Sequence, residues 1–259
     1  MPDIEPLYCA AGLLVGLLVG MTGVGGGSLM TPLLVLAFGF HPATAVGTDL
    51  LYASATKVAG TGVHGLRGSV DWRVVRRLFT GSGPAALATL AWLSLTHHSP
   101  GDVDRTITVI LGVALVLTGV ATLFRRRIVG ALTGAFTAAP PRRAALWTVV
   151  LGAALGALVT LTSVGAGALG MTALLVLYPG APVSRLVGSD IAHAVPLTLI
   201  AGLGHWLHGS VDGALLVSLL IGSVPGVVAG SLLATRIPDR VLTPVLATTL
   251  AVVGAKLLV

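Results

Sequence analysis

The two halves of the chain repeat the same short motifs in the same order. GVGGG at residues 23–27 matches SVGAG at 163–167, at an offset of 140, and Pro42 matches Pro182 at the same offset. After a one-residue insertion the offset becomes 141, and it aligns VGTD (46–49) with VGSD (187–190), GSVD (68–71) with GSVD (209–212), and GSGP (81–84) with GSVP (222–225). Between Val46 and Pro84, 14 of 39 aligned positions are identical. This regular repeat indicates a duplicated structural unit.

The repeated units are too apolar for a soluble protein. Of the 259 residues, 55% are apolar and 9% are charged, whereas soluble globular proteins have about 25% charged residues. This composition excludes the soluble enzyme classes and predicts a single integral membrane domain over residues 1–259. The formal net charge of +6 therefore indicates basic loops beside a membrane and no nucleic-acid partner. The single cysteine, Cys9, excludes an internal disulfide and a multi-cysteine metal site.

Each unit divides into five apolar segments. We expect them at 7–21, 28–38, 43–65, 75–95 and 105–124 in repeat 1 (about 7–124), and at 145–161, 168–178, 184–207, 214–235 and 241–258 in repeat 2 (about 145–258). The second segment of each repeat has about 11 residues, too few to cross a hydrocarbon core of about 30 Å. The sequence therefore predicts an all-α integral membrane protein, in which each repeat combines a broken or re-entrant helix with spanning helices.

The distribution of basic residues predicts the topology. Three crossings per repeat put its two ends on opposite sides of the membrane, so the two repeats are inverted, as in many secondary transporters. This arrangement gathers 12 of the 15 Lys and Arg residues on one face, including those of a basic linker at 125–143. By the positive-inside rule that face is cytoplasmic, and we expect a multi-pass protein of the plasma or inner membrane.

The two glycine-rich motifs interrupt the chain directly before the short segments. Helices that begin there expose unpaired backbone N–H groups at the positive end of the helix dipole, and such groups bind anions. The alternative is that the glycines only permit a kink or close helix packing. Because the interruptions occur at corresponding places in both repeats, they favour the substrate site of a transporter. The predicted donors are Gly25, Gly26, Gly27, Ser28, Gly165 and Gly167.

Ionisable residues inside the third segment of each repeat are the other candidates. Asp49 and Asp190 occupy matching places, Lys57 follows Asp49 by eight residues, and His193 follows Asp190 by three. Charged groups at membrane depth are costly, which makes them functional candidates. We expect Lys57 to balance the charge of an anion, whereas the aspartates and His193 form either a proton relay or a structural contact. The hydroxyl donors expected beside the aspartates are Thr48 and Ser189.

Two further patterns have simpler interpretations. The seven histidines do not converge on one coordination sphere, so no metal site is predicted, although His64 and His205 share matching places. The GSVD motifs favour turns in which Asp71 and Asp212 cap the helices that follow.

In combination, these motifs resemble a known family of membrane transporters. The run GLLVGLLVGMTGVGGGSLMTPLLV, followed by VGTDLL and HGLRGSVDW and repeated in weaker form in the second half, is similar to the sulfite exporter TauE/SafE family. The resemblance extends from Gly12 to about Val253. It implies a duplicated carrier that moves sulfite, another small sulfur oxyanion or an organosulfonate, usually outward.

The sequence departs from the family pattern at three places. SVGAG replaces a full glycine run, Thr172 stands where the first repeat has Pro32, and Asp49 and Asp190 stand where the family usually has a small hydroxyl residue. A carboxylate repels an anion unless it is protonated or paired. We therefore predict proton coupling, in which Asp49 or Asp190 takes up a proton as the anion binds.

The leading hypothesis is a secondary carrier that works by alternating access, with no enzymatic activity and no cofactor. The alternative is a cation carrier or channel that uses Asp49 and Asp190 as ligands. An intramembrane aspartyl protease would need a carboxyl dyad, and VGTD and VGSD both differ from the Gly-x-Gly-Asp signature of such enzymes. The expected partners are a small anion and the lipid bilayer, and the oligomeric state is left open, a homodimer included.

Overall fold

The computed structural model describes residues 4–22, 27–66, 68–95, 100–137, 140–233 and 239–258, and these are helical apart from short connections, without a strand. The first half holds α1 (Pro6–Thr22), α2 (Gly27–Leu36), α3 (Pro42–Leu66), α4 (Trp72–Leu95) and α5 (Pro100–Leu123). The linker holds α6 (Arg125–Leu132) and α7 (Gly134–Thr137). The second half holds α8 (Pro141–Thr162), α9 (Ala168–Leu177), α10 (Val183–Leu207), α11 (Gly213–Leu233) and α12 (Asp239–Leu258).

The predicted apolar segments correspond to α1–α5 and α8–α12. Five of the described helices, α4, α5, α8, α10 and α11, are long and apolar enough to cross a membrane. The short helices α2 and α9 have 10 residues each, as predicted, and are too short to span a bilayer. α6 and α7 were not predicted and divide the basic linker.

Aspartate side chains cap the helices that follow the GSVD motifs, as predicted. Oδ1 of Asp71 accepts hydrogen bonds from the backbone N–H groups of Arg73 (2.9 Å) and Val74 (3.3 Å) at the start of α4. Oδ1 of Asp212 accepts one from the N–H of Leu215 (2.9 Å) at the start of α11. Caps of this kind satisfy donors that have no partner within the helix, and they fix where each helix begins.

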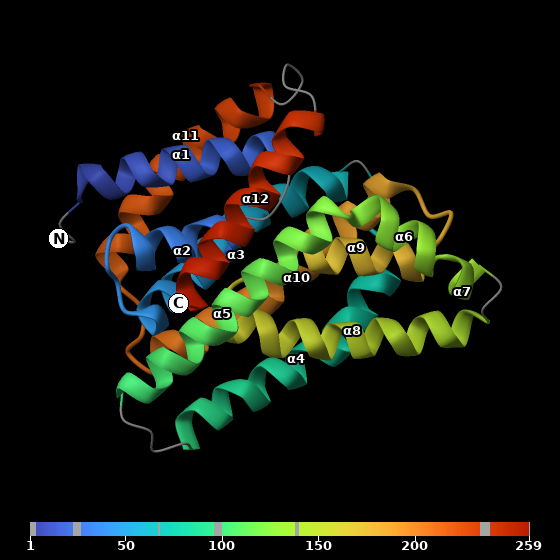
Figure 1. Cartoon of the computed structure of the whole chain (residues 1–259), viewed down its shortest axis with the longest axis horizontal. Coiled ribbons are helices and arrows are strands. Elements are labelled where there is room, and N and C mark those ends of the chain that lie inside the picture. The colour runs from blue at the N-terminus through green and yellow to red at the C-terminus, as the bar shows by residue number, and fades with distance from the viewer. Residues whose placement is uncertain are drawn as a thin grey trace.

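Helices of one half pack against helices of the other (Figure 1). α1 lies along α11, and its counterpart α8 lies along α4. α3 packs against α10, and α5 packs against α12, so these counterparts pair with each other. Each of these contacts therefore has its counterpart, or is its own counterpart, under the repeat alignment. The opposite orientation of the repeats in a membrane stays a prediction.

Glycines bring α1 into close contact with α11, and α8 into close contact with α4. A side chain at Gly12 of α1 would collide with the backbone carbonyl of Leu219 on α11, and one at Gly152 of α8 would collide with that of Leu78 on α4. The two glycines are counterparts in the repeat, and so are the two leucines. Membrane helices associate through close backbone packing, because lipid provides no hydrophobic force between them. The same interface is therefore formed twice from repeated residues.

Candidate functional site

The predicted ionisable residues lie on the two central helices, α3 and α10. These helices are antiparallel, and three contacts give their register: Gly47 against His205, Leu51 against Gly202, and Gly60 against Ile191. In this register Asp190 lies opposite residue 61, about 18 Å along the helix axis from Asp49 at about 1.5 Å per residue. Lys57 lies between the two levels and nearer to Asp190.

The ammonium group of Lys57 has no partner within the described part of the chain. The side chain is partly buried, and the ion pair found among the described residues joins His41 and Asp104 instead (3.1 Å). Lys57 interacts electrostatically with both membrane aspartates, more strongly with Asp190 than with Asp49. A lysine at membrane depth without a contacting counter-ion is costly. Its position therefore favours an anionic ligand.

The carboxyl group of Asp49 joins elements of both halves. The residue is fully buried, and its Oδ2 accepts a hydrogen bond of 2.5 Å from the Thr31 hydroxyl on α2. Ser163, in the glycine-rich break of the second half, also interacts with this carboxyl. Oδ1 of Asp49 and Oγ of Ser163 are nevertheless both buried, and neither has a hydrogen-bond partner of good geometry in the described ranges. The carboxyl is thus held by one half and faces the break of the other.

The environment of Asp190 differs from that of Asp49. Within the described part of the chain its buried Oδ1 has no hydrogen-bond partner, and a Cβ at Gly170 of α9 would lie 2.6 Å from this oxygen. In the alignment of the repeats Met171 occupies the place of Thr31, so no equivalent hydroxyl reaches this carboxyl. The cations that act on Asp190 are Lys57 and Arg125. Asp190 is therefore the less satisfied of the two aspartates.

His193 and Tyr52 occupy equivalent places and bond across the two halves. The Nε2 atom of His193 lies 2.8 Å from Oγ of Ser82 on α4, and the Tyr52 hydroxyl donates a hydrogen bond of 2.7 Å to Oγ of Ser223 on α11. Nδ1 of His193 is buried and has no hydrogen-bond partner among the residues that the structure describes. Tyr52, Ser82 and Ser223 were not predicted as site residues. The repeat offset of 141, which aligns Tyr52 with His193 and Ser82 with Ser223, is the signal that identifies them.

Helices begin directly after both glycine-rich breaks, as predicted. α2 begins at Gly27 and continues through Ser28, whereas Gly25 and Gly26 lie outside the described residues. In the second half, Gly165 (φ 121°) and Gly167 (φ 127°) adopt backbone conformations that favour glycine. α9 then begins without a side-chain cap. The N–H group of Gly170 donates a hydrogen bond of 3.1 Å to the carbonyl of Gly165 within the break, and the role of the first turn of α9 in substrate binding stays a prediction.

Thr48 and Ser189 each form a hydrogen bond with the GSVD turn of the opposite half. Oγ1 of Thr48 accepts a hydrogen bond of 3.1 Å from the backbone N–H of Asp212. Oγ of Ser189 accepts one of 2.8 Å from the backbone N–H of Asp71. These two contacts are counterparts in the repeat, and they show that VGTD and VGSD each pack against the GSVD motif of the other half.

The chain matches a family of membrane transporters over almost its full length. The model of the sulfite exporter TauE/SafE family matches residues 8–257. The chain belongs to the TauE/SafE family. This TauE/SafE protein is 38% identical over 211 residues to "Probable membrane transporter protein YjnA" of Bacillus subtilis (strain 168), and the match covers 81% of this chain and 82% of that protein.

A second relative of this TauE/SafE protein matches a shorter stretch. "Probable membrane transporter protein YunE", also of Bacillus subtilis (strain 168), is 37% identical over 73 residues, which is 28% of this chain and 27% of that protein. No solved structure matches the chain. Family membership and the apolar helices together indicate a multi-pass membrane transporter.

The ionisable residues at the centre of this TauE/SafE protein are spread along the two central helices. No group of three or more His, Cys, Asp or Glu residues converges in the described parts of the chain. Neither membrane aspartate is among the charges that act on the other. Along the two central helices, the ammonium group of Lys57 lies between the level of Asp49 and the level of Asp190.

Proposed function

We propose that this TauE/SafE protein is a secondary carrier of a small sulfur-containing anion, sulfite or an organosulfonate, which it exports by alternating access. Family membership supports the substrate class. The contacts exchanged between the two halves support a movement of two related units around a central site. The proposed site is the α3–α10 pair together with the starts of α2 and α9.

The observation on which this proposal depends is the unpaired ammonium of Lys57. It lies on the central helix pair and is influenced by both aspartates, yet it contacts neither of them. An oxyanion beside Lys57 would supply the missing counter-charge, and its oxygens would accept charge-assisted hydrogen bonds. Gly27, Ser28, Gly165 and Gly167 would add donors from the two helix starts, together with Gly25 and Gly26 of the first break.

We further propose that the anion is transported together with a proton. A carboxylate close to the bound anion would repel it, and protonation removes that repulsion. Asp190 is the preferred proton acceptor, because a hydroxyl donor of the kind that Thr31 provides to Asp49 would favour the ionised carboxylate, and Oδ1 of Asp190 has no such donor among the described residues. Its level on α10, nearer to Lys57 than that of Asp49, also places it closer to the proposed anion. His193, one helical turn from Asp190, would be the neighbouring group in a relay.

The register of α3 and α10 argues against the cation alternative. One cation held by both carboxyls needs ligands within a few ångströms of each other, whereas the aspartates lie about 18 Å apart along the helix axis. Lys57, placed between them, would repel a cation. An intramembrane protease dyad fails for the same reason, because its two carboxyls must share a proton.

The direct test is sulfite flux in proteoliposomes of the purified full chain, with and without an imposed pH gradient and with sulfate as the competing anion. We expect saturable sulfite uptake that responds to the gradient. Saturable sulfite flux that does not depend on the pH gradient would support a carrier and contradict proton coupling. No sulfite or organosulfonate flux by folded protein, with cation flux instead, would overturn the proposal.

A further inference from the structure

A basic pocket lies away from Lys57, at the junction of α5, α6 and α12. It has a volume of about 770 Å³ and is lined by Thr122, Leu123, Phe124, Arg125, Arg126, Arg127, Thr243 and Pro244. The three consecutive arginines begin the linker between the two halves. In the predicted topology this linker is cytoplasmic, so the pocket would open toward the side from which an exporter takes its substrate.

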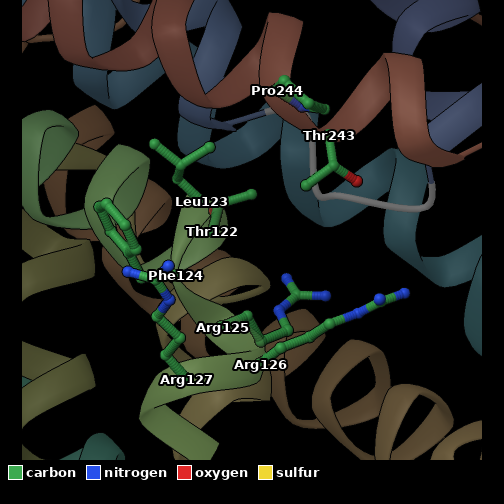
Figure 2. A pocket seen from close by; sticks show the side chains of 8 residues that line it. All are labelled: Thr122, Leu123, Phe124, Arg125, Arg126, Arg127, Thr243 and Pro244. Carbon is green, nitrogen blue, oxygen red and sulfur yellow. The ribbon is translucent and has the colours of Figure 1, made fainter.

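Arg127 points away from the other two arginines of the run (Figure 2). Figure 2 shows Arg125 and Arg126 extending to the same side of α6, with Thr243 across the pocket from them. Arg127 turns back, and its guanidinium carbon lies 5.7 Å from the ring centre of Phe124. Two of the three cations are therefore directed into the pocket, whereas Arg127 packs on an aromatic ring.

Arg125 connects this pocket with the central site. Its side chain is partly buried, and its Nε is buried without a hydrogen-bond partner among the described residues. It interacts electrostatically with Asp190. Moreover, α6 packs against α9, which carries the glycine that contacts the Asp190 carboxyl. A partly buried guanidinium group that lines a pocket and has an unpartnered Nε among the described residues is a suitable ligand for a second anion.

We infer that the pocket is a second anion site, in which Arg125 and Arg126 bind a small free oxyanion with at least two acceptor oxygens. A planar guanidinium donates two parallel hydrogen bonds to such a group. The site would hold the anion near Asp190 before the anion reaches Lys57. Anion binding in the pocket does not depend on transport, whereas the delivery step rests on the proposed function.

Binding of radiolabelled sulfite to the purified full chain in phosphatidylcholine nanodiscs tests this inference. Lys57→Gln removes the central cation, so the binding that remains in this variant reports on the pocket. In that background we expect Arg125→Gln to weaken sulfite binding at least about tenfold, as expected for loss of a charge-assisted contact. Arg127→Gln is the matched control and should bind sulfite as the Lys57→Gln parent does.

Arg126→Gln provides a second variant, because Arg126 is exposed and its replacement should not disturb folding. We expect it to weaken binding in the same direction, by about threefold. The inference is overturned if the Lys57→Gln parent binds no sulfite, or if the Arg125, Arg126 and Arg127 variants all bind alike. Displacement by phosphatidylglycerol but not by sulfate would identify a lipid-headgroup site and also overturn it.

Flux measurements on the same proteins separate this inference from the proposed function. If the unmodified chain transports neither sulfite nor an organosulfonate, while binding still depends on Arg125, the pocket is retained and the carrier of sulfur anions is rejected. If the chain transports sulfite and the Arg125 variant binds it normally, the second anion site is contradicted and the proposed transport function is supported.

Discussion

Tyr52 and His193 occupy the same place in the two halves, and each bonds a serine of the opposite half. The scaffold is thus symmetric at this position, but the chemistry is not, since one side chain is a phenol and the other an imidazole. The same asymmetry separates Lys57 from its counterpart Thr198, whose hydroxyl bonds the Ala194 carbonyl of its own helix (2.8 Å). At this pair of matching positions, the duplicated framework therefore carries a cation in one half and a hydroxyl in the other.

Replacing Lys57 with glutamine should impair anion binding. Loss of a charge-assisted contact raises the sulfite KM by about 10- to 100-fold. Sulfite flux in proteoliposomes, measured over a range of sulfite concentrations, gives this value. Lys256→Gln is the control, because Lys256 is exposed near the end of α12 and should leave the KM unchanged. A Lys57 variant with the unmodified KM would remove this residue from the site.

Much of the architecture follows from sequence patterns. The apolar segments, the two short helices and the aspartate caps were predicted, because each depends on residues close together in the chain. The repeat offset also relates positions in one half to positions in the other. Gly47 and Gly188, for example, are counterparts, and in the structure each contacts the backbone carbonyl of a serine in the opposite GSVD motif.

The partners of these residues could not be predicted in the same way. Register between helices depends on packing over many side chains, so nothing local to Asp49 shows that Thr31 and Ser163 lie beside it. The Thr48 hydroxyl, a predicted donor to the anion, accepts a hydrogen bond from the Asp212 backbone, a contact that the sequence does not reveal, and its role as a donor stays a prediction. A hydroxyl next to a candidate residue in sequence lies on a different face of a helix.

Asp190 and Asp49 should differ in their effect on proton coupling. We expect Asp190→Asn to abolish the response of sulfite flux to an imposed pH gradient, because the amide cannot exchange the proton. Asp49→Asn should reduce flux but retain that response, since Thr31 already holds this carboxyl. In the unmodified protein, raising the pH on the entry side should slow uptake, because an ionised carboxylate repels the anion. If neither variant alters the pH dependence, proton coupling through these groups is excluded.

Thr48→Ala and Ser189→Ala should lower stability and leave the sulfite KM unchanged. Each leaves a backbone N–H of the opposite GSVD turn without its acceptor, at a cost of about 1–3 kcal/mol. A lower melting temperature for both variants, of similar size, would reflect the repeated geometry. Thr249→Ala is the control, because that hydroxyl is exposed and bonds only its own helix. A raised KM with unchanged stability would instead restore the predicted substrate contact.

Gly47→Ala should disturb the interface between the two halves. Its Cβ would collide with the backbone carbonyl of Ser210, and a collision with backbone costs about 1–3 kcal/mol through displacement of the chain. Gly188→Ala should have the same effect, because its Cβ would meet the carbonyl of Ser69. The measurement is the melting temperature of the purified full chain in detergent.

The same helix provides a control for that prediction. Gly62 lies in α3, and nothing lies within 4 Å of a Cβ built there. Gly62→Ala should therefore be neutral or stabilising by up to about 1 kcal/mol, since alanine has the higher helix propensity. Equal destabilisation by Gly47→Ala and Gly62→Ala would mean that α3 tolerates no added methyl group at either position. The close approach of the GSVD turn would then not explain the effect of Gly47→Ala. If Gly47→Ala and Gly188→Ala lower the melting temperature and Gly62→Ala does not, the glycines of VGTD and VGSD are required for the close contact between the halves.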